Sequence, residues 1–161
     1  MAFEGGEFPA NHERWYIYNT GGRNEAQFNV GLSPVLLRVG LGFEFTKKMY
    51  GKPEEVRRVY DQFRTVIGRY RQGFDRFAHE NSLQVEWRPQ GTVHRQYVST
   101  RELSEWLLHC PETFDWVFVG RLLYRGIDAA ILEDPMQLKD VMESVFGSFK
   151  PLWQQAQARA T

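Results

Sequence analysis

The residues in this sequence most able to do chemistry are basic side chains placed in loops, with aromatic side chains between them. Loop lysines and arginines hold phosphates, and aromatic rings near them can stack a base. The candidates for phosphate contacts are Arg23, Lys47, Lys48, Arg88, His94 and Arg95. The candidates for a base-holding pocket are Trp15, Tyr18, Trp87 and Tyr97. The pattern favours nucleic-acid binding, and the alternative is that Trp87 is core and the arginines are ordinary surface.

The distribution of charge favours one basic face, although the formal net charge of the 161-residue chain is zero. Residues 14–101 hold 15 Lys and Arg against 8 Asp and Glu, a net charge of +7. Residues 1–13 carry −3, and residues 102–161 hold 5 basic against 9 acidic residues, a net charge of −4. A chain polarised in this way can present a basic surface to a polyanion.

Other kinds of site have weaker support in the residue spacing. The four histidines and the single cysteine, Cys110, show no zinc or metalloprotease spacing, so we expect no metal and no cofactor. The pair Gly40 and Gly42 lacks the third glycine of a dinucleotide loop. A metal-dependent nuclease needs gathered carboxylates, and the nearest set is Asp75 with Glu86. We therefore expect a binding module and not an enzyme, while a small-molecule enzyme without a recognisable motif stays open.

Length and composition predict one soluble domain. The chain is 42% apolar and 25% charged, which suffices for a core of ordinary size. No run of apolar residues is long enough for a membrane span, and residues 1–11 lack the apolar stretch of a secretory signal. A lone cysteine excludes an internal disulfide and fits a cytoplasmic location. We expect residues 1–12 to be a flexible N-terminal segment and residues 13–161 to be a single α+β domain.

Alternating apolar residues predict the strands, over residues 14–19, 28–32, 35–45, 82–88, 92–98 and 114–124. In the strand over 35–45, an apolar face alternates with a second face that bears Arg38, Gly40, Gly42 and Glu44. Two glycines on one face of a strand indicate a bulge, a strong bend or the close approach of another group.

A 3.6-residue period predicts the helices. The main helix starts at Pro53 and keeps its apolar stripe to residue 77, with Gly68 and Gly73 as points where it kinks or splits. A short helix over 99–109 begins with a capping box, and a last helix is capped by Asp134 and Gln137. Because strands and helices do not alternate regularly, we predict a mixed or mainly antiparallel twisted sheet with one long and two shorter helices packed against it.

Two short stretches resemble a known family. The run Leu37-Arg38-Val39-Gly40-Leu41-Gly42-Phe43 resembles the strand that opens the N-terminal DNA-binding domain of the 5-methylcytosine-specific restriction enzyme B. The run Tyr124-Arg125-Gly126-Ile127-Asp128, followed by an amphipathic helix, is similar to the end of that domain. The resemblance implies a module of a restriction system that reads a modified base, by flipping it, and hands the DNA to a separate nuclease or motor.

These observations predict a DNA-binding module that recognises a modified or extruded base in an aromatic pocket. Its partners would be DNA and a nuclease or motor domain or subunit, with no membrane involved. The alternative from another class is a protein-interaction or assembly subunit, in which the aromatic residues, 15% of the chain, form an interface. Salt-dependent DNA binding distinguishes the two hypotheses.

Overall fold

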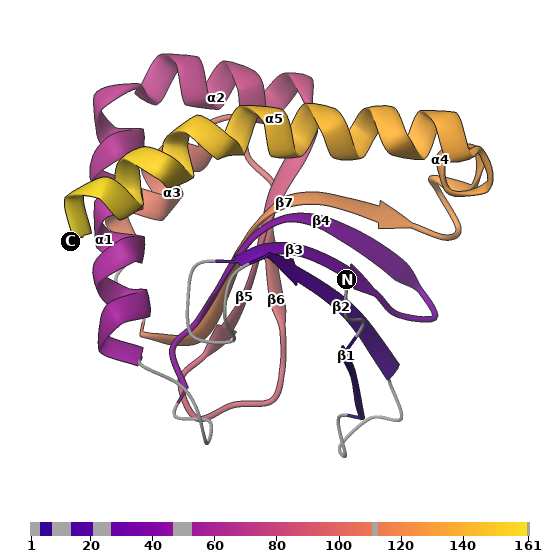
Figure 1. The fold of residues 1–161 in the computed structure, drawn as a ribbon, viewed down its shortest axis with the longest axis horizontal. Helices are drawn as coiled ribbons and strands as arrows, with labels where there is room; N and C mark the ends of the chain where they lie inside the picture. Colours follow the sequence, from indigo (N-terminus) through magenta and orange to yellow (C-terminus); the bar gives the residue numbers. More distant parts are fainter. Residues whose placement is uncertain (1–3, 8–13, 21–26, 47–52, 111–112, 161) are drawn as a thin grey trace.

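The computed structural model describes residues 4–7, 14–20, 27–46, 53–110 and 113–160, with the backbone alone described for residues 4–7, 14–20, 27, 157 and 159–160 (Figure 1). The strands are β1 (Glu4–Glu7), β2 (Arg14–Thr20), β3 (Gln27–Leu32), β4 (Leu36–Glu44), β5 (Leu83–Pro89), β6 (Gln96–Val98) and β7 (Phe114–Tyr124). The helices are α1 (Pro53–Arg69), α2 (Arg71–Glu80), α3 (Leu103–His109), α4 (Ala129–Glu133) and α5 (Pro135–Ala160).

The strands form one sheet in the order β1-β2-β3-β4-β7-β5-β6, and every pairing between neighbours is antiparallel. In Figure 1 the long helices lie above and to the left of this twisted sheet. The prediction of an α+β fold with a mainly antiparallel sheet is confirmed. The helices differ in detail, since the longest is the C-terminal α5, with 26 residues.

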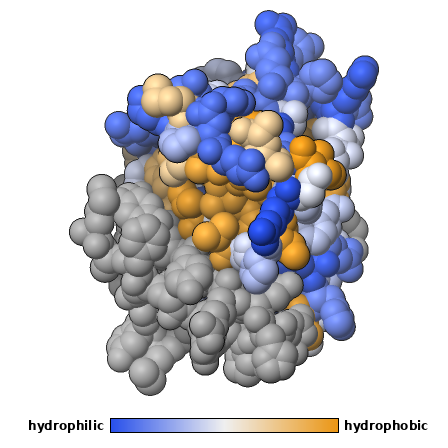
Figure 2. Space-filling view, turned by 90° about the vertical axis from the view of Figure 1, so that its right-hand side faces the viewer, coloured by the Kyte–Doolittle hydropathy of each residue, from blue (hydrophilic) through white to orange (hydrophobic). Residues whose placement is uncertain are grey.

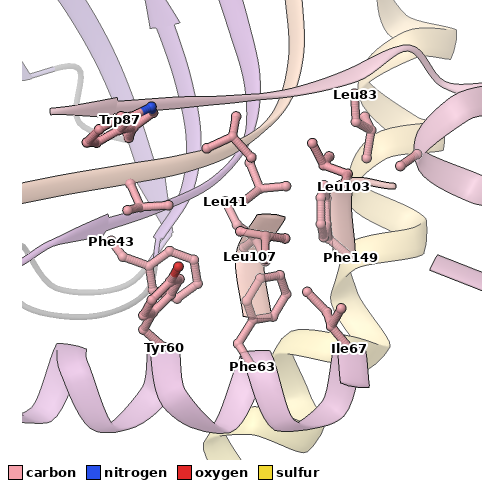
Figure 3. Packing of buried hydrophobic residues seen from close by; sticks show 14 of the residues in the cluster. Leu41, Phe43, Tyr60, Phe63, Ile67, Leu83, Trp87, Leu103, Leu107 and Phe149 are labelled. Carbon is pink, nitrogen blue, oxygen red and sulfur yellow. The ribbon is translucent and has the colours of Figure 1, made fainter. Parts of the chain in front are cut away.

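The core lies between the sheet and the helices. The apolar stripe of α1 is buried, as the 3.6-residue period predicts, and Phe63 and Ile67 are at most 1% exposed. Figure 3 shows these side chains pointing toward Leu41 and Phe43 of β4, with Leu107 of α3 among them. Figure 3 also places Trp87 of β5 in this layer. One face of the sheet is therefore covered by helices.

The long predicted helix is divided at Tyr70, between the two glycines that mark its weak point. The φ angle of Tyr70 is −119°, which is outside the helical region, and α2 begins at the next residue. Tyr70 turns its side chain outward and is 55% exposed. The break lets α2 change direction and lie over β5, as a single straight helix could not.

The predicted caps have different outcomes. Asp134 caps α5 as expected, accepting hydrogen bonds from the backbone N–H of Met136 at 2.8 Å and from Gln137. The expected start of a helix at Ser99 is wrong, because α3 begins at Leu103. Its first turn is held instead by Asp75 of α2, whose carboxylate accepts from the N–H and the hydroxyl of Ser104 at 2.8 and 2.6 Å.

Two further features concern the ends of the chain. Residues Glu4–Glu7, expected within a flexible segment, pair with β2 as the edge strand β1. At the other end, α5 continues through Pro151, which cannot donate the helical hydrogen bond to the carbonyl of Gly147. Within the described ranges, no helix is both long and apolar enough to cross a membrane.

Candidate functional site

The helix-free face of the sheet carries a buried polar cluster. Because side chains alternate along a strand, the residues between the core positions of β4, β5 and β7 point away from the helices. Among these, Glu86 is 0% exposed and Arg38 is 2% exposed, and Asn29 of the neighbouring β3 is also 0% exposed. Buried charges occur in proteins when they are paired and hydrogen-bonded, and they are a frequent feature of functional sites.

Glu86 is the centre of this cluster. Its Oε1 atom accepts hydrogen bonds from Nη1 of Arg38 at 2.8 Å and from the indole Nε1 of Trp116 at 3.0 Å, and it also pairs with Nη1 of Arg95. Its Oε2 atom is buried and has no hydrogen-bond partner among the described residues. An unpaired buried acceptor costs about 1–3 kcal/mol, or more for a charged group. The cluster therefore offers a carboxylate oxygen that a hydrogen-bond donor would satisfy.

The Arg38 side chain contacts both polar and aromatic neighbours. Its Nε donates to the side-chain oxygen of Asn29 at 2.8 Å, and its guanidinium carbon lies 4.9 Å from the ring centroid of Trp116 and 5.4 Å from that of Phe118. Those two rings are stacked at an interplanar angle of 10°. Burial lowers the pKa of Arg38 to about 10, and the neighbouring Glu86 limits that decrease. The guanidinium thus stays charged at neutral pH.

Glycines create the space for these large side chains. A Cβ atom on Gly31 would lie 2.6 Å from Nε of Arg38, and one on Gly42 would lie 2.3 Å from the Trp116 ring. Gly40 and Gly120 are paired across β4 and β7, and a Cβ on either would lie 2.2 Å from a backbone oxygen of the other strand. The glycines of β4, expected to mark close approach or a bend, therefore accommodate a second layer of side chains.

Gly120 lies beneath the ion pair of Arg38 and Glu86. On β7 it lies between Leu122, which is opposite Arg38 on β4, and Phe118, which is opposite Glu86 on β5. Arg38 and Glu86 therefore reach each other across β7, over the position where Gly120 has no side chain. Sequence reasoning missed this pairing, because the two residues are 48 positions apart.

The cluster reaches the surface at β6. Tyr97 is opposite Glu86 in the β5–β6 register and is 46% exposed. Arg95, just before β6, has a side chain that is 17% exposed where it pairs with Glu86. Beside it, Arg88 pairs with Glu44 at 3.2 Å. An exposed tyrosine and two partly exposed arginines therefore border the buried carboxylate.

The structure separates the predicted base-binding residues. Trp87 is 4% exposed in the helix-covered core, with its ring 5.8 Å from those of Trp106 and Phe114. It shares its face with Leu83 and Val85, whereas Tyr97 is on the opposite face. A base-stacking position for Trp87 is therefore corrected to a core position. Trp15 and Tyr18 lie on β2, whose backbone alone is described.

The predicted phosphate contacts are also divided. Arg88 and Arg95 border the cluster and pair with carboxylates of the protein. His94 is exposed in the segment before β6. Arg23, Lys47 and Lys48 lie outside the described residues. The basic side chains that the structure places near the cluster are thus those of the β5–β6 hairpin.

Residues that the sequence reasoning left out of the site are Asn29, Glu86, Trp116, Phe118 and Arg38. A usable signal was present, since Arg38 and Glu86 each interrupt an apolar strand where the neighbouring positions are core. The nuclease alternative finds no support in this geometry, because Asp75 caps α3 while Glu86 is on the helix-free face. Over the part of the chain that is described, no three His, Cys, Asp or Glu side chains gather as a metal site would require.

No protein-family model matches the chain, no curated protein matches its sequence significantly, and no solved structure matches its fold significantly.

Proposed function

We propose that this chain is a DNA-binding module that recognises a modified or flipped base at the helix-free face of its sheet and serves a separate nuclease or motor. The observation that carries the proposal is the buried, unpaired Oε2 atom of Glu86, held beside two guanidinium groups. A nucleobase edge presents N–H donors next to acceptor atoms, and a carboxylate flanked by arginines complements such an edge.

The position of the cluster favours an extruded base over a paired one. Glu86 is completely buried, so the Watson–Crick edge of a base within a duplex cannot reach it. A flipped base can enter at the border formed by Tyr97 and Arg95, stack on the tyrosine ring and donate to Oε2 of Glu86. The polar cluster would then read the edge, while the tyrosine would supply stacking energy that any base can use.

Contacts to the phosphates would come from basic residues around this entrance. His94 is exposed next to Arg95 on the same segment of chain. Lys47, Lys48 and Arg23 remain predicted contacts. Because phosphate contacts release counterions, each would contribute binding that weakens with salt and does not depend on the base.

The proposal is tested by fluorescence anisotropy with three duplexes at low salt: fully paired and unmodified, carrying one 5-methylcytosine, and carrying one mismatched base. The decisive variant is Tyr97→Ala. Loss of one stacked base costs about 1–3 kcal/mol, so its Kd for the preferred duplex should rise roughly 5- to 150-fold. Its Kd for the unmodified, fully paired duplex should stay near that of the wild type.

Tyr70→Ala is the matched control, because Tyr70 is an exposed tyrosine at the junction of α1 and α2. Its affinity for all three duplexes should be unchanged. Equal effects of the two variants would show that the helix-free face is not the base site. Absence of any binding by the wild type at low salt would exclude the DNA-binding function itself.

A second function, that of an assembly subunit, is favoured by one specific observation. An apolar groove lies along α5, away from the polar cluster. Binding of a base at the helix-free face and assembly through α5 would use different surfaces of the molecule.

A further inference from the structure

A groove of about 910 Å³ lies between α5 and the start of β3. Figure 2 shows an apolar hollow on the side of the molecule where α5 begins, bordered by hydrophilic side chains. The groove is lined by Phe28, Pro135, Leu138, Lys139, Met142, Glu143, Phe146, Gly147, Lys150 and Trp153. Apolar residues form its floor, and the charged ones are all on α5.

The composition of the groove is that of an interface core. The Phe28 ring lies 5.4 Å from that of Phe146 and 5.3 Å from that of Trp153, and all three side chains are only partly buried. Met142 lines the groove beside them. Aromatic residues and methionine are enriched at the centres of protein interfaces, while lysine and glutamate are found at the rims.

Charged residues of α5 could pair with the same residues of a second copy of the helix. Glu143, Gly147 and Lys150 are spaced four and three residues apart, so they share one side of the helix. Glu143 and Lys150 lie at equal distances on either side of the point between Phe146 and Gly147. If a second α5 packs antiparallel across a two-fold axis at that point, each Glu143 faces Lys150 of the other copy. Such an arrangement forms two ion pairs by symmetry.

Gly147 fits the same axis. A Cβ atom at this position would meet nothing within 4 Å, so no contact in its own chain excludes a side chain there. Across the two-fold axis it would face Phe146 of the second copy. The absence of a side chain at Gly147 leaves room for that ring to pack against the helix backbone.

We propose that the α5 groove is the interface of a homodimer in which two copies of α5 pack antiparallel about the Phe146–Gly147 point. A helix of 26 residues is roughly 39 Å long, which spans the whole groove. A stable interface buries about 800 Å² on each partner, and two such helices with their floor residues can provide this area. The helix-free face is on the other side of the sheet and takes no part in this interface.

The test is sedimentation equilibrium of the full chain over a wide range of concentration, with charge-reversal variants. The wild type should be a dimer. Glu143→Lys and Lys150→Glu each replace two attractive contacts with two repulsive ones, and each should raise the dimer Kd at least about tenfold. The double variant Glu143→Lys/Lys150→Glu restores both pairs with the signs exchanged, and its Kd should return to within about threefold of the wild type.

Arg76→Glu is the control for charge reversal. Arg76 is an exposed residue of α2 and is not among the residues that line the groove. Its reversal should change the dimer Kd by less than about threefold. Gly147→Leu tests shape in place of charge, since leucine favours the helix yet blocks Phe146 of the second copy, so it should yield a well-folded monomer.

Rescue by the double variant establishes the antiparallel pairing. A monomeric wild type at all concentrations overturns the proposal, and a groove that then binds an apolar dye would be a small-ligand site. A dimer that is insensitive to both charge reversals and to Gly147→Leu also overturns it, because the interface would lie elsewhere.

Discussion

The two faces of the central sheet are equally buried but are stabilised by different physics. On β4, Val39 and Leu41 face the helices and are 0% exposed, while Arg38 between the core positions faces away and is 2% exposed. The helix-covered face is stabilised by burial of apolar area, which is non-directional. The helix-free face depends on directed hydrogen bonds around Glu86 and on glycines that leave space for large side chains.

The difference teaches where the molecule tolerates change. An apolar core accepts volume-conserving substitutions at small cost. A buried ion cluster does not, because removing one charged member takes away part of what compensates the buried charge of the others. Apolar residues would stabilise this face more easily than the buried Arg38, Glu86 and Asn29 do, and this contrast is the reason for proposing a binding role for the cluster.

The largest loss of stability is expected from a substitution in the pair Gly40 and Gly120, which lies beneath the polar cluster. Gly120→Val would place a side chain 2.2 Å from the carbonyl oxygen of Val39 and 2.7 Å from the Cα atom of Gly40, where the backbone cannot move without separating β4 from β7. We expect a loss of at least about 4 kcal/mol in the free energy of unfolding, measured by urea denaturation.

Gly73→Ala is the control for this substitution. Gly73 is an exposed residue of α2, and a Cβ there would meet nothing within 4 Å. Alanine should stabilise the protein by about 0.5–1 kcal/mol, because glycine is unfavourable in helices. A Gly120→Val variant as stable as Gly73→Ala would refute the tight packing described for the helix-free face.

The next effect is expected from Glu86→Gln, which keeps the shape of the side chain but removes its charge. The charge of Glu86 that pairs with both Arg38 and Arg95 would then be lost from a buried position, so we expect a loss of about 3–5 kcal/mol in unfolding free energy. Glu105→Gln breaks the exposed pair with Arg71, whose side chains are 45–46% exposed, and should cost less than about 1 kcal/mol. Similar denaturation midpoints for the two variants would show that the cluster is not held by charge.

The sequence predicted the elements better than the site. A strand repeats every two residues, so the alternation in β4 places Arg38 and Leu41 on opposite faces. The same alternation in β5 separates Glu86 from Trp87, whereas the composition of the hairpin alone predicts one basic and aromatic surface. A local pattern thus contained the correction that moves Trp87 into the core.

What local patterns do not contain is the order of strands. Arg38 meets Glu86 because β7 lies between β4 and β5, although β7 comes after both in the chain. The cap that Asp75 provides for Ser104 likewise joins residues 29 positions apart. Such pairings depend on how α2, α3 and β7 pack, and no periodicity within one element encodes them.

The smallest expected effect tests whether polarity is tolerated on the helix-covered face. Tyr60 is 2% exposed among Phe43, Phe45 and Phe114, and its hydroxyl has no hydrogen-bond partner among the described residues. An unpaired buried hydroxyl is unfavourable, so Tyr60→Phe should raise the free energy of unfolding by about 1 kcal/mol at pH 7. The opposite sign would indicate that a buried water satisfies the hydroxyl.

The stability of Tyr60→Phe relative to the wild type should also depend on pH. Burial raises the pKa of Tyr60 above its ordinary value, so above about pH 10 the unfolded chain releases this proton while the folded protein keeps it. The unfolded state then binds fewer protons, and the wild type should lose roughly 1.4 kcal/mol of stability per pH unit from this residue. Tyr60→Phe should lack that loss, so its advantage should grow between pH 10 and 11.

Arg38, on the other face of the sheet, contributes a pH dependence of stability with the opposite sign. Its pKa is lowered to about 10, so above that pH the folded protein releases the proton before the unfolded chain does, and stability from this group rises with pH. Because Arg38 is present in both proteins, the difference between wild type and Tyr60→Phe isolates the tyrosine. A constant difference from pH 7 to 11 would mean that the Tyr60 hydroxyl ionises in the folded protein as readily as in the unfolded chain. The helix-covered layer would then admit water, and the contrast between the two faces would not hold.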